Sequence, residues 1–400
     1  MKRYVLSLFL FLILTSFLTG CWNRRELNEI AIAVGMGLDK VGKQYRVSVQ
    51  VVNPKEVASG KGQGLSPAIL YTTEGDTILE AVRRMSTLSP RKIYFSHLRM
   101  LLIGESLARE GMAESLDLLQ RDQEIRSDFY LVVTQNSSAE EVLKIMTPLE
   151  KVPANKLFNT LETSEKYWSP SLTDTLDETI RDLIDDGKHP VLSGLRIVGD
   201  PKVGVSKKNV ENIDISTELK DSGLAAFKED KLIGWLNEEE SKGYNYIRGN
   251  VKSTAGHVDC LGGGKLTTEV VRTKAKIKGR VVQGQPQVNV TLQAEQNIAA
   301  VECRNLELIK TETIRQIEKE SEAEIISLME SAIKKAQNSF GADIFGFGEA
   351  IRRADPKAWK KMKEDWDERY FTDLPVHIKV KVKIRRIGTV GDSFLNNTKE

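Results

Sequence analysis

The strongest constraint on the fold is a strict alternation of apolar and polar side chains close to the C-terminus. Val376, Ile378, Val380, Val382 and Ile384 alternate with His377, Lys379, Lys381, Lys383 and Arg385. A period of two directs the two sets to opposite faces of a β-strand, so one face is predicted to be buried and the other basic. Two longer strands are predicted upstream, Val271 to Val282 and Val288 to Ile298, joined by a turn at 283–286.

Helices are expected to cover one side of this C-terminal sheet. A long helix is predicted from about Leu306 to Gln337, and a second carries Trp359, Met362, Trp366 and Tyr370 at helical spacing. We interpret these four side chains as core packing, with a groove for a partner as the alternative. Residues 246–395 are therefore predicted to form an α+β domain with an antiparallel-type sheet and long helices.

In the preceding part of the chain, the sequence pattern predicts short apolar strands that alternate with helices. This pattern predicts a mixed α/β domain with some parallel pairing over residues 21–198. Residues 199–245 are predicted to form a small middle domain or linker with a hairpin made by Ala225 to Phe227 and Leu232 to Leu236. A multidomain α+β protein is expected, because a chain of 400 residues exceeds what one core usually serves.

The N-terminus reads as a secretion signal, residues 1–20, that does not belong to the fold. Lys2 and Arg3 precede an apolar run from Val5 to Phe17, which is too short to span ~30 Å of hydrocarbon comfortably. Leu18-Thr19-Gly20 then leads to Cys21, the pattern of a lipobox. We predict that Cys21 is lipidated with a diacylglyceryl group, since two chains anchor where one holds only marginally. The alternatives are a plain transmembrane anchor or an ordinary cleaved signal.

Two basic features could meet a membrane or a partner. Trp22, Arg24 and Arg25 directly follow the predicted anchor, where an aromatic ring and two guanidinium groups suit the headgroup region. An unstructured tether with incidental charge is equally consistent with them. For the basic face of the last strand, a solvated face that discourages edge pairing is the favoured interpretation, and contact with anionic lipid or an acidic partner is the alternative.

Charge and motifs exclude several classes of function. The first 20 residues hold two of the 58 basic residues and none of the 56 acidic ones, so the remaining chain is balanced, which disfavours nucleic-acid binding. No G-x-S-x-G, H-E-x-x-H or P-loop motif occurs, and the four histidines lack ligand spacing. We therefore expect no enzyme, no metal and no cofactor, and we interpret His97 as structural. No ligand-binding residue is identified.

Two cysteines remain after Cys21. Cys260 and Cys303 could form a disulfide in an oxidising compartment. They lie far apart in the sequence, and neither has metal-ligand spacing to a histidine or to another cysteine. Two separate buried thiols are the expectation.

Several stretches together resemble the Ger(x)C family of spore germination lipoproteins, the C subunits of nutrient germinant receptors. The matching stretches run from Cys21 to about Gly388: Gly20 to Leu27, Ala31 to Gly35, Ser89 to Leu98, Gly223 to Lys228, Lys231 to Leu236, Phe345 to Gly348, Asp355 to Trp359, and Trp366. The chain departs from the family pattern at Asn23, where the family often has aspartate.

The resemblance implies a three-domain, non-enzymatic subunit on the outer face of the inner spore membrane. It would act with two integral membrane subunits, one of them polytopic and transporter-like, in triggering germination by nutrients. Only Cys21 is carried over as a functional residue, as the lipid acceptor. Other hypotheses are a solute-binding lipoprotein of an uptake system, against which the dissimilar halves count, and an envelope hydrolase, for which the sequence offers no nucleophile or metal set.

Overall fold

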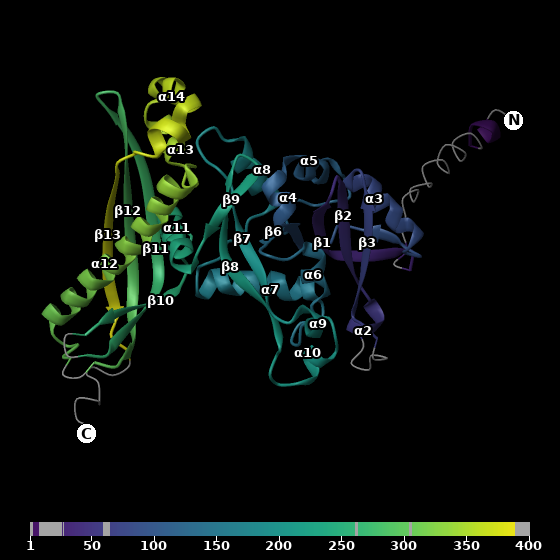
Figure 1. The fold of residues 1–400 in the computed structure, drawn as a ribbon, viewed down its shortest axis with the longest axis horizontal. Coiled ribbons are helices and arrows are strands. Elements are labelled where there is room, and N and C mark those ends of the chain that lie inside the picture. Colours follow the sequence, from purple (N-terminus) through teal and green to yellow (C-terminus); the bar gives the residue numbers. More distant parts are fainter. Residues whose placement is uncertain are drawn as a thin grey trace.

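The computed structural model describes residues 3–7, 26, 28–58, 65–260, 263–303 and 306–388. Two β-sheets divide the chain, each with its own helices (Figure 1). The first has nine strands in the order β3-β2-β1-β5-β6-β7-β8-β9, with β4 paired to β1, and the second has four in the order β10-β11-β12-β13. A mixed α/β region followed by a sheet with long helices confirms the predicted fold class.

The strands of the first sheet are β1 (Ile30–Val41), β2 (Gln44–Val52), β3 (Ala68–Gly75), β4 (Lys92–Tyr94), β5 (Met100–Gly104), β6 (Tyr130–Thr134), β7 (Val191–Gly199), β8 (Thr217–Lys228) and β9 (Lys231–Leu236). Its helices are α2 (Pro54–Ala58), α3 (Ile78–Arg84), α4 (Glu105–Glu110), α5 (Ala113–Arg121), α6 (Ala139–Lys144), α7 (Pro153–Tyr167), α8 (Leu176–Ile184), α9 (Pro201–Gly204) and α10 (Lys208–Glu211).

The centre of the first sheet is buried on both faces. β1, β5, β6 and β7 pair in parallel, as the alternation of strands and helices predicted. Leu101 and Ile103 of β5 pack into one core, while Met100 and Leu102 pack into another on the opposite face. A parallel strand covered on both faces reads as an unbroken apolar run, which is the pattern seen at 100–103.

The predicted hairpin of residues 225–236 is confirmed as β8 and β9, joined at Glu229, whose φ is 54°. These strands pair with β7 and extend the first sheet, so part of the stretch 199–245 continues the N-terminal architecture. The helix that follows, α11 (Glu238–Arg248), packs on the long helix of the second sheet.

The second sheet comprises β10 (Thr254–Asp259), β11 (Lys265–Val282), β12 (Gln285–Val301) and β13 (Val376–Arg386), with helices α12 (Thr311–Lys335), α13 (Phe347–Ala354) and α14 (Pro356–Met362) between the last two strands. The predicted strand pair is confirmed, and its two-residue turn has positive φ at both Gln283 and Gly284. β13 pairs with β12 in parallel rather than antiparallel, because the helices between them carry the chain back along the sheet.

The apolar face of the second sheet packs against α11, α12 and α13. Trp359, Met362 and Trp366 are buried in this core and Tyr370 packs on its border, which confirms their predicted role. Two glutamates of α12, Glu318 and Glu322, accept hydrogen bonds from the backbone N–H groups of Ile384 and Val382 at 2.9 and 3.0 Å. Side chains of α12 therefore occupy part of the edge of β13.

The expectation of two separate thiols is wrong, because Cys260 and Cys303 form a disulfide with their Cα atoms 5.8 Å apart. Cys260 follows β10 and Cys303 follows β12, and both of these strands pair antiparallel with β11. That pairing returns the chain to the same end of the sheet, so a separation of 43 residues in sequence becomes a contact in space.

Candidate functional site

The residues singled out at the N-terminus, Cys21, Trp22, Arg24 and Arg25, lie outside the described residues. They stay predictions from the sequence. The first strand of the first sheet, β1, begins at Ile30. A lipid attached to Cys21 would therefore be joined to the folded chain at this sheet. No helix within the described residues is long and apolar enough to cross a membrane.

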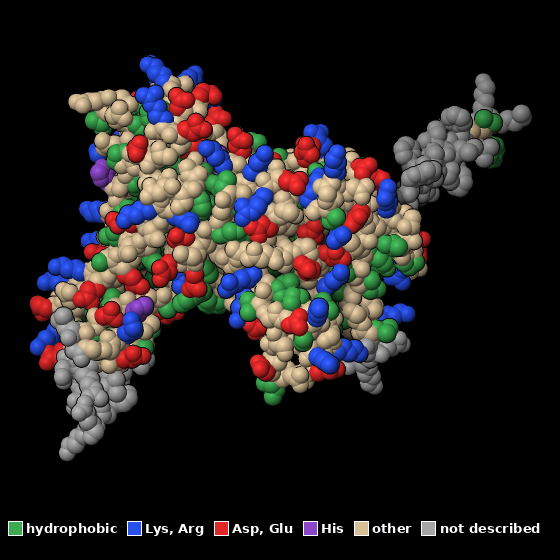
Figure 2. Space-filling view, viewed as in Figure 1, with side chains coloured by type: hydrophobic (Ala, Val, Ile, Leu, Met, Phe, Trp, Pro, Cys, Tyr) green, Lys and Arg blue, Asp and Glu red, His purple; other side chains and the backbone are tan. Residues whose placement is uncertain are grey.

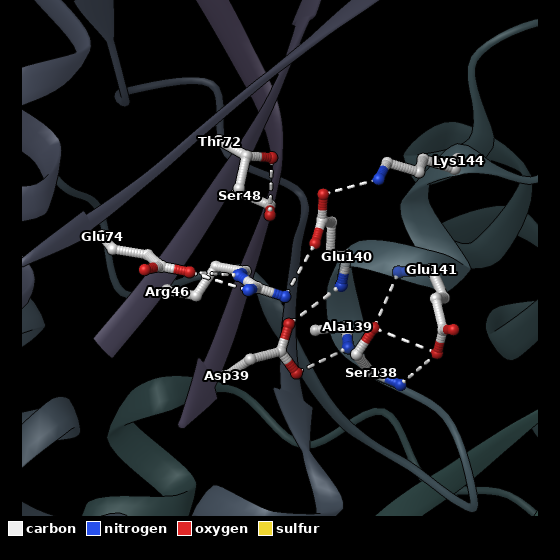
Figure 3. A network of polar contacts seen from close by, with 10 residues as sticks. All are labelled: Asp39, Arg46, Ser48, Thr72, Glu74, Ser138, Ala139, Glu140, Glu141 and Lys144. Carbon is white, nitrogen blue, oxygen red and sulfur yellow. Dashed lines mark hydrogen bonds and ion pairs between the residues drawn. The ribbon is translucent and has the colours of Figure 1, made fainter. Parts of the chain in front are cut away.

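A buried carboxylate, Asp39, forms the centre of one polar network in the first sheet (Figure 3). Its two oxygens accept hydrogen bonds from the backbone N–H groups of Ala139 and Glu140, at 2.8 and 3.0 Å, in the first turn of α6. Burial raises the pKa of Asp39 above its ordinary value, and the two N–H groups act in the opposite direction. A Cβ on Gly104 would lie 2.1 Å from Asp39 Oδ1, so only glycine leaves room for the carboxylate.

Arg46 extends this network towards solvent, as Figure 3 shows. It contacts Glu74 of β3 at 2.7 Å and Glu140 of α6 at 3.3 Å, and Lys144 in turn pairs with Glu140 at 2.5 Å. Each carboxylate in this chain of contacts meets a cation or an N–H group. The network therefore fastens α6 to β1, β2 and β3.

An open groove of about 780 Å³ lies between α3, β4 and α5. Its floor is apolar, with Val82, Phe95 and Leu118 among the lining residues. Charged residues surround the floor, including Lys92, which pairs with Glu124 at 2.6 Å. The lining contains no histidine and no cysteine. The groove has the volume of a small-molecule site.

The densest polar contacts join the two sheets, and we call the stretches 185–189, 343–352 and 363–367 the interdomain junction. Asp343 is fully buried there and accepts hydrogen bonds from three backbone N–H groups on Oδ1 and from Gly348 N and Trp366 Nε1 on Oδ2. Burial raises the pKa of Asp343 to about 6, against the lowering effect of these donors. The stretch 345–348, singled out in the sequence, thus leads into the first turn of α13 and directs its N–H groups to one carboxylate.

His189 carries the junction across to the first sheet. Its Nε2 lies 2.6 Å from Asp367 Oδ2, while its Nδ1 accepts a hydrogen bond from Glu229 N at the β8–β9 turn. Because Nδ1 is an acceptor, the proton resides on Nε2 and is donated to Asp367. Burial raises the pKa of Asp367, but the hydrogen bonds from His189 and from Asp343 N outweigh it and leave that pKa below its usual range.

Backbone contacts and ion pairs complete the junction. His189 N donates to Asp343 O at 2.9 Å, and Glu349 N donates to Gly187 O at 3.2 Å. Arg352 pairs with Asp185 at 2.7 Å. A Cβ on Gly187 would lie 2.5 Å from Glu349 N, so glycine is required where the two backbones approach. The structure therefore couples the two sheets through fixed polar contacts as well as a shared apolar core.

The sequence did not identify the interdomain junction. The pattern Asp185-Asp186-Gly187 indicated only the end of a helix, and the partners of these residues lie more than 150 positions away. The only sequence signal for the junction was the resemblance to the Ger(x)C family, whose matching stretches include 345–348 and Trp366. His97 lies at the surface with its ring 6.0 Å from that of Tyr94. Among the described residues, no group of three or more histidine, cysteine or acidic side chains could hold a metal ion.

Two family models match the chain one after the other. The model described as spore germination protein N-terminal domain matches residues 23–197, and the model described as spore germination B3/GerAC like, C-terminal, matches residues 222–388. The first match ends within β7, the second begins within β8, and the interdomain junction spans both matched stretches.

Similar proteins align along almost their whole length. Spore germination protein KC of Bacillus subtilis is 33% identical over 399 residues, covering 97% of each chain. Spore germination protein A3 of the same organism is 27% identical over 397 residues, covering 98% of this chain and 99% of the relative. Among solved structures, the GerBC protein superposes with a TM-score of 0.54 at 18% identity, covering 88% of this chain and 96% of that one, which shows a shared fold.

Proposed function

The chain belongs to the family of GerAC-like spore germination proteins, and from this premise we propose that it is a membrane-anchored lipoprotein subunit of a nutrient germinant receptor. The observation that carries the proposal is the end-to-end alignment with proteins named for spore germination, in which both matched domains keep their order. Similarity confined to one of the two domains would indicate a shared fold but not a shared role.

The anchor is assigned to Cys21 on the lipobox that precedes it. Each buried CH₂ contributes ~0.8 kcal/mol to membrane binding, so two acyl chains hold the domains at the bilayer. Tethering raises the effective concentration of those domains near integral membrane partners without any further contact. Trp22, Arg24 and Arg25 would then lie at the headgroup level, next to the anchor.

A non-catalytic coupling role agrees with the geometry of the described residues. The polar centres at Asp39 and Asp343 are saturated with N–H donors, and the interdomain junction holds the two sheets together through His189, Asp367 and Gly187. In this proposal, the interdomain junction transmits a displacement of one sheet to the other. The two sheets differ in size and topology, which argues against the paired similar lobes of a solute-binding lipoprotein.

The test replaces Cys21 by alanine in the chromosomal gene and follows two readouts, the distribution of the chain between membrane and soluble fractions and nutrient-induced germination. Cys21→Ala should abolish acylation, strip the chain of its stable anchor and slow germination. Ser216→Ala is the control, since it changes an exposed side chain outside the lipobox and should leave the chain on the membrane and germination unchanged. Full germination by spores whose Cys21→Ala protein is entirely soluble would reject the tether.

A further inference from the structure

The outer face of the second sheet is far more basic than the alternation in the last strand indicated. Two strands contribute exposed cations to it. From β11 these are Arg272, Lys274, Lys276, Lys278 and Arg280, and from β13 they are Lys379, Lys381, Lys383 and Arg385. We call these nine side chains the basic face.

Strand register arranges the basic face as two parallel columns. Thr291 of β12 pairs with Lys276 on one side and Lys379 on the other, and Gln293 pairs in the same way with Lys274 and Lys381. With strands ~4.8 Å apart, the columns are ~10 Å apart, and cations two residues apart in a strand are ~7 Å apart. The column between them is short and polar. The result is an array of cations whose spacing is fixed by the sheet.

The charge of the basic face is almost uncompensated. Among the residues of β12 that lie between paired cations of the two columns, one is a carboxylate, Glu295. Glu295 pairs with Arg385 at 2.5 Å. The remaining eight cations form no ion pair within the described part of the chain. Neighbouring cations lie within a Debye length of ~8 Å, so they repel one another, and an anionic surface would relieve this repulsion.

Among the described residues, no helix packs on the basic face of the sheet. The opposite side packs on α12 and α13, and α12 crosses in front of the sheet in Figure 1. The surface over the first sheet's domain in Figure 2 has a different character, since its Lys and Arg side chains are interspersed with Asp and Glu. A single sign of charge is therefore a local feature of this face and not a property of the whole surface.

We propose that the basic face binds the anionic headgroups of a phospholipid bilayer. A plane of phosphates can engage both columns at once, whereas the rows of the face, which include His377, hold no aliphatic, Phe, Tyr or Trp side chain of the kind that forms the core of a protein–protein interface. The side chains between the columns are Gln287, Asn289, Thr291 and Gln293, which can hydrogen-bond to phosphate oxygens. This contact is separate from acylation at Cys21 and does not rest on the proposed function.

The test uses the chain from Trp22 onwards, which carries no acyl group and keeps every strand and helix of both sheets. Its co-sedimentation is measured with vesicles of phosphatidylcholine alone and of phosphatidylcholine mixed equally with phosphatidylglycerol. The face variant combines Lys276→Gln, Lys379→Gln and Lys381→Gln. The control variant combines Lys202→Gln, Lys207→Gln and Lys208→Gln, which make the same charge change at exposed positions of the first sheet's domain.

We expect binding only to the anionic vesicles, declining as salt is raised. Each lysine near the surface contributes roughly fivefold to the partition coefficient, so the face variant should lose roughly 100-fold and the control variant little. Equal losses in the two variants would overturn the assignment, as would binding that is indifferent to lipid charge. Binding of soluble polyglutamate or of duplex DNA by this face, without binding of anionic vesicles, would overturn it as well.

Discussion

A buried carboxyl group without a partner, Asp174, makes a sharp prediction about pH. Asp174 lies between α7 and α8, and its Oδ2 is buried with no hydrogen-bond donor. Burial raises its pKa from 3.8 to about 7, with the positive charge of Lys188 acting against this. The folded protein therefore binds this proton more tightly than the unfolded chain does.

The sign follows from linkage. A carboxyl group whose pKa is raised on folding contributes its full stability below pH ~4, and that contribution is lost as the pH rises through about 7. The difference between the two pKa values corresponds to about 4 kcal/mol above pH 7. Asp174→Asn cannot ionise and escapes this loss. The variant should match the native chain near pH 4 and exceed its free energy of unfolding by up to about 4 kcal/mol at pH 8.

Urea unfolding of the native chain and of Asp174→Asn at pH 5, 6, 7 and 8 measures this difference directly. The advantage of the variant should grow by about 2–3 kcal/mol between pH 5 and pH 8. Asp214→Asn is the control, because it makes the same replacement at an exposed position. A constant offset between native and Asp174→Asn chains across this range would refute the reasoning, since it would mean that Asp174 does not change its protonation on folding.

Two further predictions concern stability. Cys260→Ala opens the disulfide that closes a 43-residue separation, and it should cost about 2–4 kcal/mol of unfolding free energy, which reduction of the native chain should reproduce in thermal unfolding. Gly187→Ala places a Cβ against the backbone of Glu349 and should loosen the interdomain junction by about 1–3 kcal/mol, seen as faster proteolysis between the sheets. Gly284→Ala is the control for backbone strain away from the junction, since its φ of 80° disfavours alanine although nothing lies within 4 Å of its Cβ, and equal proteolysis of the two variants would contradict a strain specific to the junction.

Local periodicity was sufficient to predict most of the elements. The alternation in 376–385 and the apolar run 98–103 depend only on which face of a strand is buried, so the strands they predicted are present. The direction of β13 could not be read in this way. Parallel and antiparallel strands can share the same alternation, and the parallel pairing with β12 depends on how the helices between them return the chain.

The candidate sites depend on contacts between distant residues, which one sequence does not reveal. His189 contacts Asp367, which lies 178 positions later in the sequence. Cys260 and Cys303 come together because the strands that precede them, β10 and β12, both pair with β11. The alternation in the last strand predicted one column of the basic face. The second column, on β11, could be assigned only from the register of β12, which pairs with both strands. By contrast, the lipobox is a local signal, so Cys21 could be proposed from the sequence alone.

Mass analysis of the N-terminal peptide, prepared from spore membranes, tests the central proposal most directly. If the chain is a tethered germination subunit, the peptide should begin at Cys21 and carry the mass of a diacylglyceryl group on its sulfur. A peptide that starts upstream with the leader intact, or a first residue with a free thiol, would show that fatty chains do not hold this protein at the membrane.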